Sequence, residues 1–497
     1  MVKNTVRREV DEVELFGRRV IYTDVDEITP ENIETVLRES LLIHQVNRSE
    51  IQYLYEYYRG KQPILNRKKD VRPEINNKVV ENMANYIVSF KTGYLMGEPI
   101  QYVARGKDSA SVSESVIQLN EYVFAEEKAA KDKELADWFH ICGTAFRMAL
   151  PDEIGEEDEA PFEITTLDPR FAFVVYRNTP DRKPLMGVTY TVDRKGSTHY
   201  YCYTRDLFME CIDYKPAVID THLLGGIPIV EYPLNTSRLG AFETVIPLLD
   251  AINTTGSNRV DGVEQFIQAL MVFYNVDISS EDFKTLKEEG AIKVKDVDPQ
   301  MKARIEYLIN NLNQGETQTL VNYMFDTVLI LCGMPNRNGG SSTSDTGVAV
   351  IYRDGWSDAE ARAKDAELMF KRAEKKFLKV VLQISNILGD TNLKVKNIDI
   401  RFTRRNYENI ESKANVLTQM LSNNKIHPRL AFEHCGMFAD PDLAYEISME
   451  YAEEQERKAL ERAKVVGGED NESKTNTDSD KSNRNDPQEG KSGGDQN

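Results

Sequence analysis

Apolar residues recur at helical spacing through most of the first 146 residues. Two such patterns lie between residues 28 and 60, and the second begins at Ser49, a residue type that caps helices. A third runs from Ile75 to Phe90 through VVENMANYIVSF. A short strand is predicted at residues 100–103 and a further helix at residues 131–146. The first part of the chain is therefore expected to be mainly helical.

The pattern changes between residues 145 and 235. Runs of β-branched and aromatic residues, such as FEITTL, FAFVVYRN, GVTYTVD and HYYCYTRD, alternate there with turn residues. This alternation predicts an antiparallel β region. Its first turn, PDEIGEEDEAP, is densely acidic but lacks the alternating ligands and central glycine of an EF-hand, so we interpret it as an exposed hairpin turn.

Helical spacing returns between Thr244 and Asn275, which would give a helix about 45 Å long. Its middle, NTTGSNRVDG, is small and polar, so we expect it to pack against other copies of the chain or to face water. A compact insert follows at residues 277–316, with a short helix and the strands AIKVKD and ARIEYLIN. A return helix is predicted at residues 316–333.

A very long apolar seam follows a loop rich in glycine and serine. Ser357 and Glu360 form a capping-box pattern, and the helix is expected to end at Gly389. Periodicity alone leaves open whether this helix belongs to the core of a domain or is shared between subunits. The seam consists of Ala366, Phe370, Ala373, Phe377, Val380, Ile384 and Ile387.

The C-terminal part begins with one more predicted strand, IDIRFTRR, at residues 398–405. Residues 411–464 have helical patterns, broken before Pro428 and Pro441. Beyond Val466 no aliphatic or aromatic residue occurs, so the tail has nothing to bury and is expected to be disordered.

Composition and charge narrow the possible classes of protein. The chain has 497 residues, 40% of them hydrophobic and 29% charged, which indicates a soluble protein of roughly two to four domains. No apolar run approaches the roughly 20 residues that span a bilayer, and the charged N-terminus shows no secretory signal, so we expect a cytosolic protein. A net charge of −19 argues against a simple basic DNA-binding surface. The five cysteines lack metal-site or redox spacing and are expected to be reduced and mostly buried.

The loop CGMPNRNGGSSTSDTGVAV, residues 332–350, is the most distinctive candidate for chemistry. A phosphate-binding loop requires a lysine after its last glycine, but Gly340 is followed by Ser341. The six histidines do not pair at metal-ligand spacing, although His427 and His434 come nearest, with Cys435. No catalytic motif is found, so the sequence predicts no enzyme, no catalytic residue, no metal and no cofactor.

The order of these elements resembles that of the portal proteins of tailed bacteriophages. The resemblance covers roughly residues 30–450 and includes NNKVVENMANYIVSFKTGYLMGEPIQY, LLGGIPIVEYPLN, the small insert between two helices, the glycine and serine loop, and the long helix after it. It is strongest for the branch typified by long-tailed phages of Gram-positive bacteria. It implies an α+β, predominantly helical portal fold that forms a ring, with wing, stem, clip and crown.

The resemblance also implies a role for each part of the chain. The expected parts are an N-terminal arm (1–27), a wing (28–243), a stem helix (244–276), a clip (277–315), a second stem helix (316–333), a tunnel loop (334–347), a long wing helix and strand (348–404), a crown (405–465) and a disordered tail (466–497). Portal rings of this family typically contain twelve copies. Twelve copies at −19 each would repel a phosphate backbone and favour sliding over adhesion.

The tunnel loop is the implied DNA-channel site. Its single cation, Arg337, is expected to add one ring of charge, and its polar side chains are expected to contact DNA weakly as it passes. The candidate residues are Asn336, Arg337, Asn338, Gly339, Gly340, Ser341, Ser342 and Thr343.

The implied partners and location follow from the same resemblance. They are other copies of the chain, the terminase large subunit, a head-completion or adaptor protein, the major capsid and scaffolding proteins, and double-stranded DNA bound without sequence specificity. No membrane partner is implied. The protein would lie at one capsid vertex of the virion, and in the host cytoplasm during assembly. Two alternatives remain, a capsid or scaffolding protein without a DNA channel and a metal-dependent nuclease that uses the acidic loops.

Overall fold

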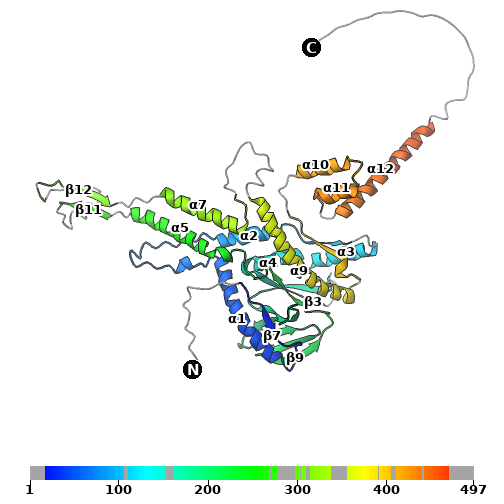
Figure 1. The fold of residues 1–497 in the computed structure, drawn as a ribbon, viewed down its shortest axis with the longest axis horizontal. Helices are drawn as coiled ribbons and strands as arrows, with labels where there is room; N and C mark the ends of the chain where they lie inside the picture. The colour runs from blue at the N-terminus through cyan, green and yellow to red at the C-terminus, as the bar shows by residue number, and fades with distance from the viewer. Residues whose placement is uncertain are drawn as a thin grey trace, which may run out of the picture. The chain divides into compact units, whose positions relative to one another are not determined.

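The structure is a computed structural model of an α+β protein. It describes residues 17–105, 110–152, 160–267, 270–276, 304–308, 314–336, 355–389, 391–404, 410–438 and 441–469, together with a few single positions between 279 and 302. The chain divides into two compact units, residues 1–408 and residues 409–497. The first unit contains every strand that the structure describes and the longest helix (Figure 1).

Helices of the first unit come mostly from the N-terminal third and from three later segments. They are α1 (Ile33–Tyr58), η1 (Pro63–Asn66), α2 (Met83–Leu95), α3 (Ala110–Ala125), α4 (Lys128–Cys142), η2 (Glu243–Val245), α5 (Ile246–Ile267), α7 (Gln314–Cys332), α9 (Trp356–Leu388) and η3 (Val395–Asn397).

Strands of the first unit form four sheets. Six strands pair in the order β1-β5-β6-β7-β8-β9, three in the order β10-β3-β4, and two further pairs are β11-β12 and β13-β2. Every pairing is antiparallel except that of β1 with β5, so the antiparallel β region predicted at residues 145–235 is confirmed. The strands are β1 (Ile21–Thr23), β2 (Gln101–Ala104), β3 (Thr144–Pro151), β4 (Phe162–Leu167), β5 (Ala172–Arg177), β6 (Pro184–Val192), β7 (Thr198–Tyr203), β8 (Leu207–Ile212), β9 (Lys215–Thr221), β10 (Ile229–Pro233), β11 (Leu270–Tyr274), β12 (Arg304–Leu308) and β13 (Ile398–Arg401).

Three helix boundaries predicted in the first 146 residues are wrong. The two helices expected between residues 28 and 60 are one, because α1 continues without a break through Ser49. The helix expected to start at Ile75 starts at Met83, after the side chain of Asn82 accepts a hydrogen bond from the Asn85 amide. The helix expected at residues 131–146 ends at Cys142, because Gly143 has a φ of +74° and the chain turns there into β3.

Helix α9 forms much of the core of the first unit. Six of the seven predicted seam residues, Ala366 to Ile384, are buried against α3, α4 and the β10-β3-β4 sheet of the same chain. Ile387, the seventh, is 53% exposed. The seam is therefore filled from within one chain, and the interpretation of α9 as a core helix is confirmed.

The predicted capping box at the start of α9 is wrong. Gly355, with a φ of +79°, is the N-cap, and no side chain caps the helix. Trp356 packs against the rings of Phe90 and Tyr94, with centroids 6.1 Å apart in each pair. Glu360 instead accepts hydrogen bonds from the Tyr94 hydroxyl and from the Arg404 guanidinium. Aromatic packing on α2 therefore determines where α9 begins.

A buried group of charged residues joins α4, β3 and α9 around Glu374, which is fully buried. Lys128 Nζ lies 2.9 Å from Glu374 Oε1, and the hydroxyls of Tyr102 and Tyr232 donate hydrogen bonds of 2.5 and 2.6 Å to its two oxygens. Arg147 lies 2.6 Å from Asp132 in the same group. Burial alone would raise the pKa of Glu374. The neighbouring cations and hydroxyls have the larger effect and lower the pKa to about 2. The carboxylate is therefore ionised inside the core.

The second unit is helical, as predicted. It contains α10 (Ile410–Leu421), α11 (Pro428–Cys435) and α12 (Pro441–Glu469), and the two predicted breaks coincide with the starts of α11 and α12. Phe432 packs against Tyr445 with ring centroids 5.9 Å apart. The predicted disordered tail, residues 466–497, is wrong at its start, because residues 466–469 belong to α12; residues 470–497 lie outside the described residues.

All five cysteines are free and buried, which confirms the interpretation of them as reduced core residues. Within the described part of the chain, no helix is both long and apolar enough to span a bilayer.

Candidate functional site

Helices α5 and α7 pack together and carry the β11-β12 hairpin between them along the chain (Figure 1). The long helix predicted from Thr244 to Asn275 ends at Ile267, and residues 270–274 form strand β11. The second predicted strand of the insert is confirmed in part as β12, Arg304–Leu308. The partner of β12 is β11. The first predicted strand, AIKVKD at residues 291–296, lies outside the described residues.

The polar middle of α5 binds residues 62–82 of the same chain, which we call the strap. The strap contains the short helix η1 and then has no regular structure from residue 75 to the start of α2. Asn253, Ser257 and Asp261 are buried, with exposures of 0, 0 and 2%. Their side chains accept hydrogen bonds of 2.8, 2.9 and 2.7 Å from three strap amides, those of Glu81, Val79 and Asn77 respectively. The expectation that this face of α5 packs against other copies or faces water is therefore wrong.

The spacing of these contacts explains why the strap is extended. Four helical residues rise about 6.0 Å, and two residues of an extended chain span about 6.6 Å. Every fourth side chain of α5 can therefore meet every second amide of the strap. This bonding uses the amides that a helix at residues 75–82 would need, which is why Ile75 and Val79 are not helical despite their apolar spacing.

Asp261 also holds two cations of the strap. Lys69 Nζ lies 2.7 Å from its carboxylate and Arg67 Nη1 lies 3.3 Å from it. Burial raises the pKa of Asp261, but hydrogen bonds from Lys69 and Asn77 bring it below its usual value. The carboxylate therefore stays ionised, and the strap is fixed to α5 by charge as well as by its amides.

Helix α7 packs on α5 through one face only. Arg259 of α5 donates a 2.8 Å hydrogen bond to Gln318 of α7, and the buried face of α7 joins the same core as α1 and α2. The opposite face is apolar and exposed. Leu320, Tyr323, Ile330 and Leu331 are 51, 67, 71 and 51% exposed. At 100° per residue these four side chains and Glu316 share one side of the helix, which we call the α7 stripe.

The end of α7 fixes the first residues of the predicted tunnel loop. Gly333, with a φ of +60°, ends the helix, and the Met334 amide bonds back to the Leu329 carbonyl at 2.9 Å. A Cβ at Gly333 would lie 2.7 Å from Arg362 of α9, so only glycine fits there. Lys91 of α2 donates a 2.7 Å hydrogen bond to the Cys332 carbonyl. The chain therefore leaves α7 in a defined direction.

A cleft of about 310 Å³ lies beside the end of α7 and the first turns of α9. It is lined by residues of α2, the end of α7, the start of α9 and the segment before α5, including Lys91, Cys332 and Arg362. Burial lowers the pKa of Lys91, and burial raises the pKa of the Cys332 thiol to about 11. The thiol is protonated at neutral pH, so the cleft has no reactive thiolate.

Of the predicted loop residues, the structure describes only Asn336. Its side-chain amide donates a 2.8 Å hydrogen bond to Asp326 of α7. Asn336 is therefore tied to the helix and lies at the foot of the loop. The other predicted residues, Arg337, Asn338, Gly339, Gly340, Ser341, Ser342 and Thr343, lie outside the described residues.

The candidates for metal binding are resolved in part. Among the residues that the structure describes, no group of three or more His, Cys, Asp or Glu side chains could hold a metal ion. Most of the acidic turn between β3 and β4 lies outside the described residues. His427 and Cys435 have local roles instead, since His427 caps α11 through the Arg429 amide and the Cys435 thiol donates to the Phe432 carbonyl.

Comparison with known proteins decides the family. Residues 39–466 match the model of a family described as phage portal protein, SPP1 Gp6-like. The chain belongs to this family. The predicted resemblance to phage portal proteins is therefore confirmed. No curated protein matches the chain.

Solved structures include similar chains. One, from the neck of an empty GTA particle computed with C6 symmetry, is 11% identical and aligns with a TM-score of 0.42. The alignment covers 71% of this portal protein and 90% of that chain.

Proposed function

We propose that this portal protein assembles into a closed ring at one vertex of the capsid. The channel of the ring would admit double-stranded DNA during packaging and release it during ejection. The main support for assembly is the α7 stripe, because its four large apolar side chains are exposed in the isolated chain. Rings of copies joined head to tail would cover such a face in every subunit. We expect twelve copies.

We further propose roles for the parts of the chain. Helices α5 and α7 would be the stem within residues 244–276 and 316–333, and the β11-β12 hairpin would belong to the clip, residues 277–315, which would dock the packaging motor. Residues 28–243 and 348–404 would form the wing, and residues 405–465 the crown. Support comes from the packing of α5 on α7 and from the hairpin that α5 and α7 carry between them along the chain.

Residues 334–347 would form the tunnel loop that touches passing DNA. The fixed end of α7 at Gly333 and the start of α9 at Gly355 support this proposal, since both feet of the loop are positioned by the core. Contact would be weak, because Arg337 is the only cation between residues 334 and 347 and each copy carries a net charge of −19.

The partners would be those of a packaging vertex. They are the terminase large subunit, a head-completion or adaptor protein, and the major capsid and scaffolding proteins, with assembly in the host cytoplasm before the protein becomes part of the virion. Membership of the phage portal family supports this set of partners.

The alternative is a capsid or scaffolding protein without a channel, for which the exposed α7 stripe would mediate open or irregular contacts. Electron microscopy of the purified protein separates the two. We expect class averages of a closed ring with a central hole and one rotational symmetry. Particles without a hole, or only open filaments, would contradict the proposal.

A further inference from the structure

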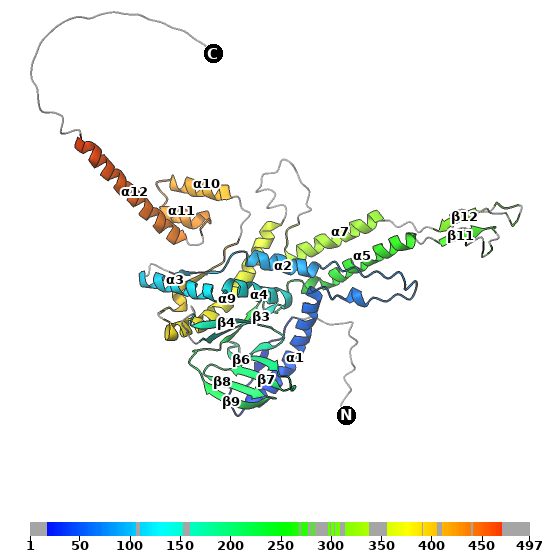
Figure 2. The ribbon, with the colours of Figure 1, turned by 180° about the vertical axis from the view of Figure 1, so that it is seen from behind.

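The outer side of α9 carries a group of cations near the middle of the helix. Arg372, Lys375, Lys376 and Lys379 are all exposed. At 100° per residue these four side chains lie within an arc of about 100°, and they span about 10 Å along the helix. We call them the α9 basic face. The opposite side of α9 is apolar and packs on α4 and the β10-β3-β4 sheet, beside which α9 runs in Figure 2.

The charge of the α9 basic face is not neutralised by the part of the chain that the structure describes. The ion pairs of α9 in that part use other residues, and none involves the four cations of the face. Between residues 370 and 388 the only carboxylate is Glu374, which is buried on the opposite side. On the side of the cations, Asp365 is exposed about 10 Å before Arg372 along the helix. The face therefore keeps four positive charges, in a chain whose net charge is −19.

The cations of this face also repel one another. Partial burial lowers the pKa of Lys376, and the neighbouring Arg372 lowers it further. Glu231 has the opposite effect, but its carboxylate is already paired with Arg238 at 2.5 Å. An anion from outside the chain would relieve this repulsion.

The absence of apolar side chains from the α9 basic face indicates the class of its partner. Ala373, Phe377, Leu378 and Val380, which lie between the cations in the sequence, are all buried. Leu368, one turn before Arg372, is the first exposed apolar residue before the cations on this side of the helix. Interfaces between proteins usually have an apolar centre, whereas surfaces that bind nucleic acid are polar and positively charged. The chemistry therefore favours a phosphate backbone over a protein surface.

We infer that the α9 basic face contacts the phosphate backbone of double-stranded DNA. This inference rests on the proposed function and adds a second contact to that of the tunnel loop. Since α9 begins at Trp356, the face lies about 24 to 35 Å along the helix from its start. Contacts with phosphates carry no sequence information, and they let a protein slide along DNA. The net charge of −19 opposes binding at long range, so the contact acts at short range and weakens as salt is added.

Neutralising the α9 basic face tests this contact. The variant carries Arg372→Gln, Lys375→Gln, Lys376→Gln and Lys379→Gln. The probe is an end-labelled linear duplex of about 30 base pairs, and its binding to the full chain is followed by fluorescence anisotropy from about 50 to 200 mM salt. We expect the variant to bind at least about tenfold more weakly at the lowest salt concentration. The slope of log affinity against log salt should fall by about 3, because each lost phosphate contact removes about 0.9 from it.

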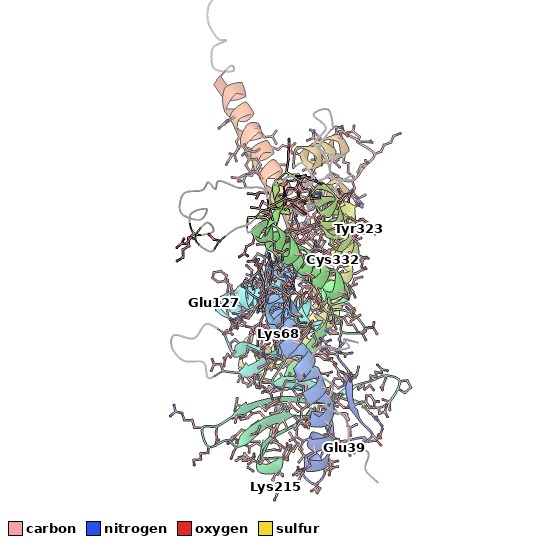
Figure 3. The ribbon with its side chains drawn as sticks, turned by 90° about the vertical axis from the view of Figure 1, so that its left-hand side faces the viewer. Glu39, Lys68, Glu127, Lys215, Tyr323 and Cys332 are labelled. Carbon is pink, nitrogen blue, oxygen red and sulfur yellow. The ribbon has the colours of Figure 1, made fainter. Side chains whose placement is uncertain are left out.

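A matched control separates the local contact from net charge. It carries Arg194→Gln, Lys195→Gln, Arg205→Gln and Lys215→Gln, which change exposed residues of the six-stranded sheet and its turns. Figure 3 shows Lys215 at the lower end of the first unit, below Cys332 of α7. Both fourfold variants lose four positive charges, so −19 becomes −23 in each. The control is expected to bind the duplex like the original chain, and all chains should have the same thermal midpoint by circular dichroism.

Each outcome supports or overturns the contact. Equal slopes for the α9 variant and the control, or no binding of the duplex by the original chain, would refute it. Loss of binding in Arg337→Gln but not in the α9 variant would assign the contact to the tunnel loop alone. A folded α9 variant that no longer forms rings would show that the face joins copies instead, and tighter binding of polyglutamate than of duplex would assign it to an acidic protein. Electron microscopy of the original chain tests the ring separately, because a chain without rings refutes the proposed function whatever its affinity for DNA.

Discussion

The buried carboxylate of Glu374 shows how much one side chain of the core controls. Two cations and two tyrosine hydroxyls converge on it, in the middle of a helix whose other buried residues, except Ser385, are apolar. Its pKa of about 2 lies below the ordinary value of 4.5, so its ionisation stabilises the fold above about pH 4.5 and this stabilisation is lost as the pH falls towards 2. The spacing of apolar residues in α9 did not predict a buried carboxylate, because Glu374 follows the seam residue Ala373 and is not itself at a seam position.

Glu374→Gln is expected to destabilise the chain by about 3–5 kcal/mol, because it leaves the two buried cations Lys128 and Arg147 with a single carboxylate, that of Asp132. The measurement is the free energy of unfolding of the first unit in urea at pH 7. Glu34→Gln is the control. Glu34 lies 2.8 Å from Arg38, and both side chains are exposed to solvent. We therefore expect this control to lower the free energy of unfolding by less than about 1 kcal/mol. Equal losses for the two variants would show that the buried cations find other partners.

At the scale of elements, the sequence predicted the helices and strands whose apolar faces pack against other parts of the same chain. The antiparallel β region, the core role of α9 and the breaks before Pro428 and Pro441 follow from spacing and turn chemistry. The sequence-based prediction was wrong where tertiary contacts override the local hydrophobic pattern. Ile75 and Val79 have helical spacing, but α5 takes the strap amides, and Ser357 has the pattern of a cap, but Trp356 fixes the start of α9.

The candidate site could be predicted only in part for the same reason. The run NTTGSNRVDG is visibly polar, and a spacing of four between Asn253, Ser257 and Asp261 is a signal that one face is polar. Nothing in the spacing says whether water, another copy or a strap covers it. The helical spacing of Ile75 and Val79 gives no sign of the strap, because its conformation is imposed by α5.

Ser257→Ala tests the strap as an element. The alanine removes only the hydroxyl and leaves the Val79 amide without its 2.9 Å hydrogen bond, which should cost about 1–3 kcal/mol. Because the strap is held on α5 by a row of such bonds, we expect amides 77–81 to lose hydrogen-exchange protection while β3 and β10 keep theirs. Thr254→Val is the control, since the Thr254 hydroxyl is exposed and bonds only to the Asp250 carbonyl of its own helix. Unchanged exchange in the Ser257 variant would show that the amide row does not hold the strap.

For the whole molecule, a portal has to join like-charged copies and still let DNA pass. A net charge of −19 per copy repels both neighbours and phosphates at long range. Local surfaces must therefore overcome repulsion between copies.

Truncation after Ala463 tests which parts of the chain the ring needs. It removes five basic and eight acidic residues, so the net charge changes only from −19 to −16. Since no aliphatic or aromatic residue lies beyond Val466, we expect the shortened chain to form rings of the same symmetry. Loss of rings in the tail truncation would show that the tail takes part in assembly.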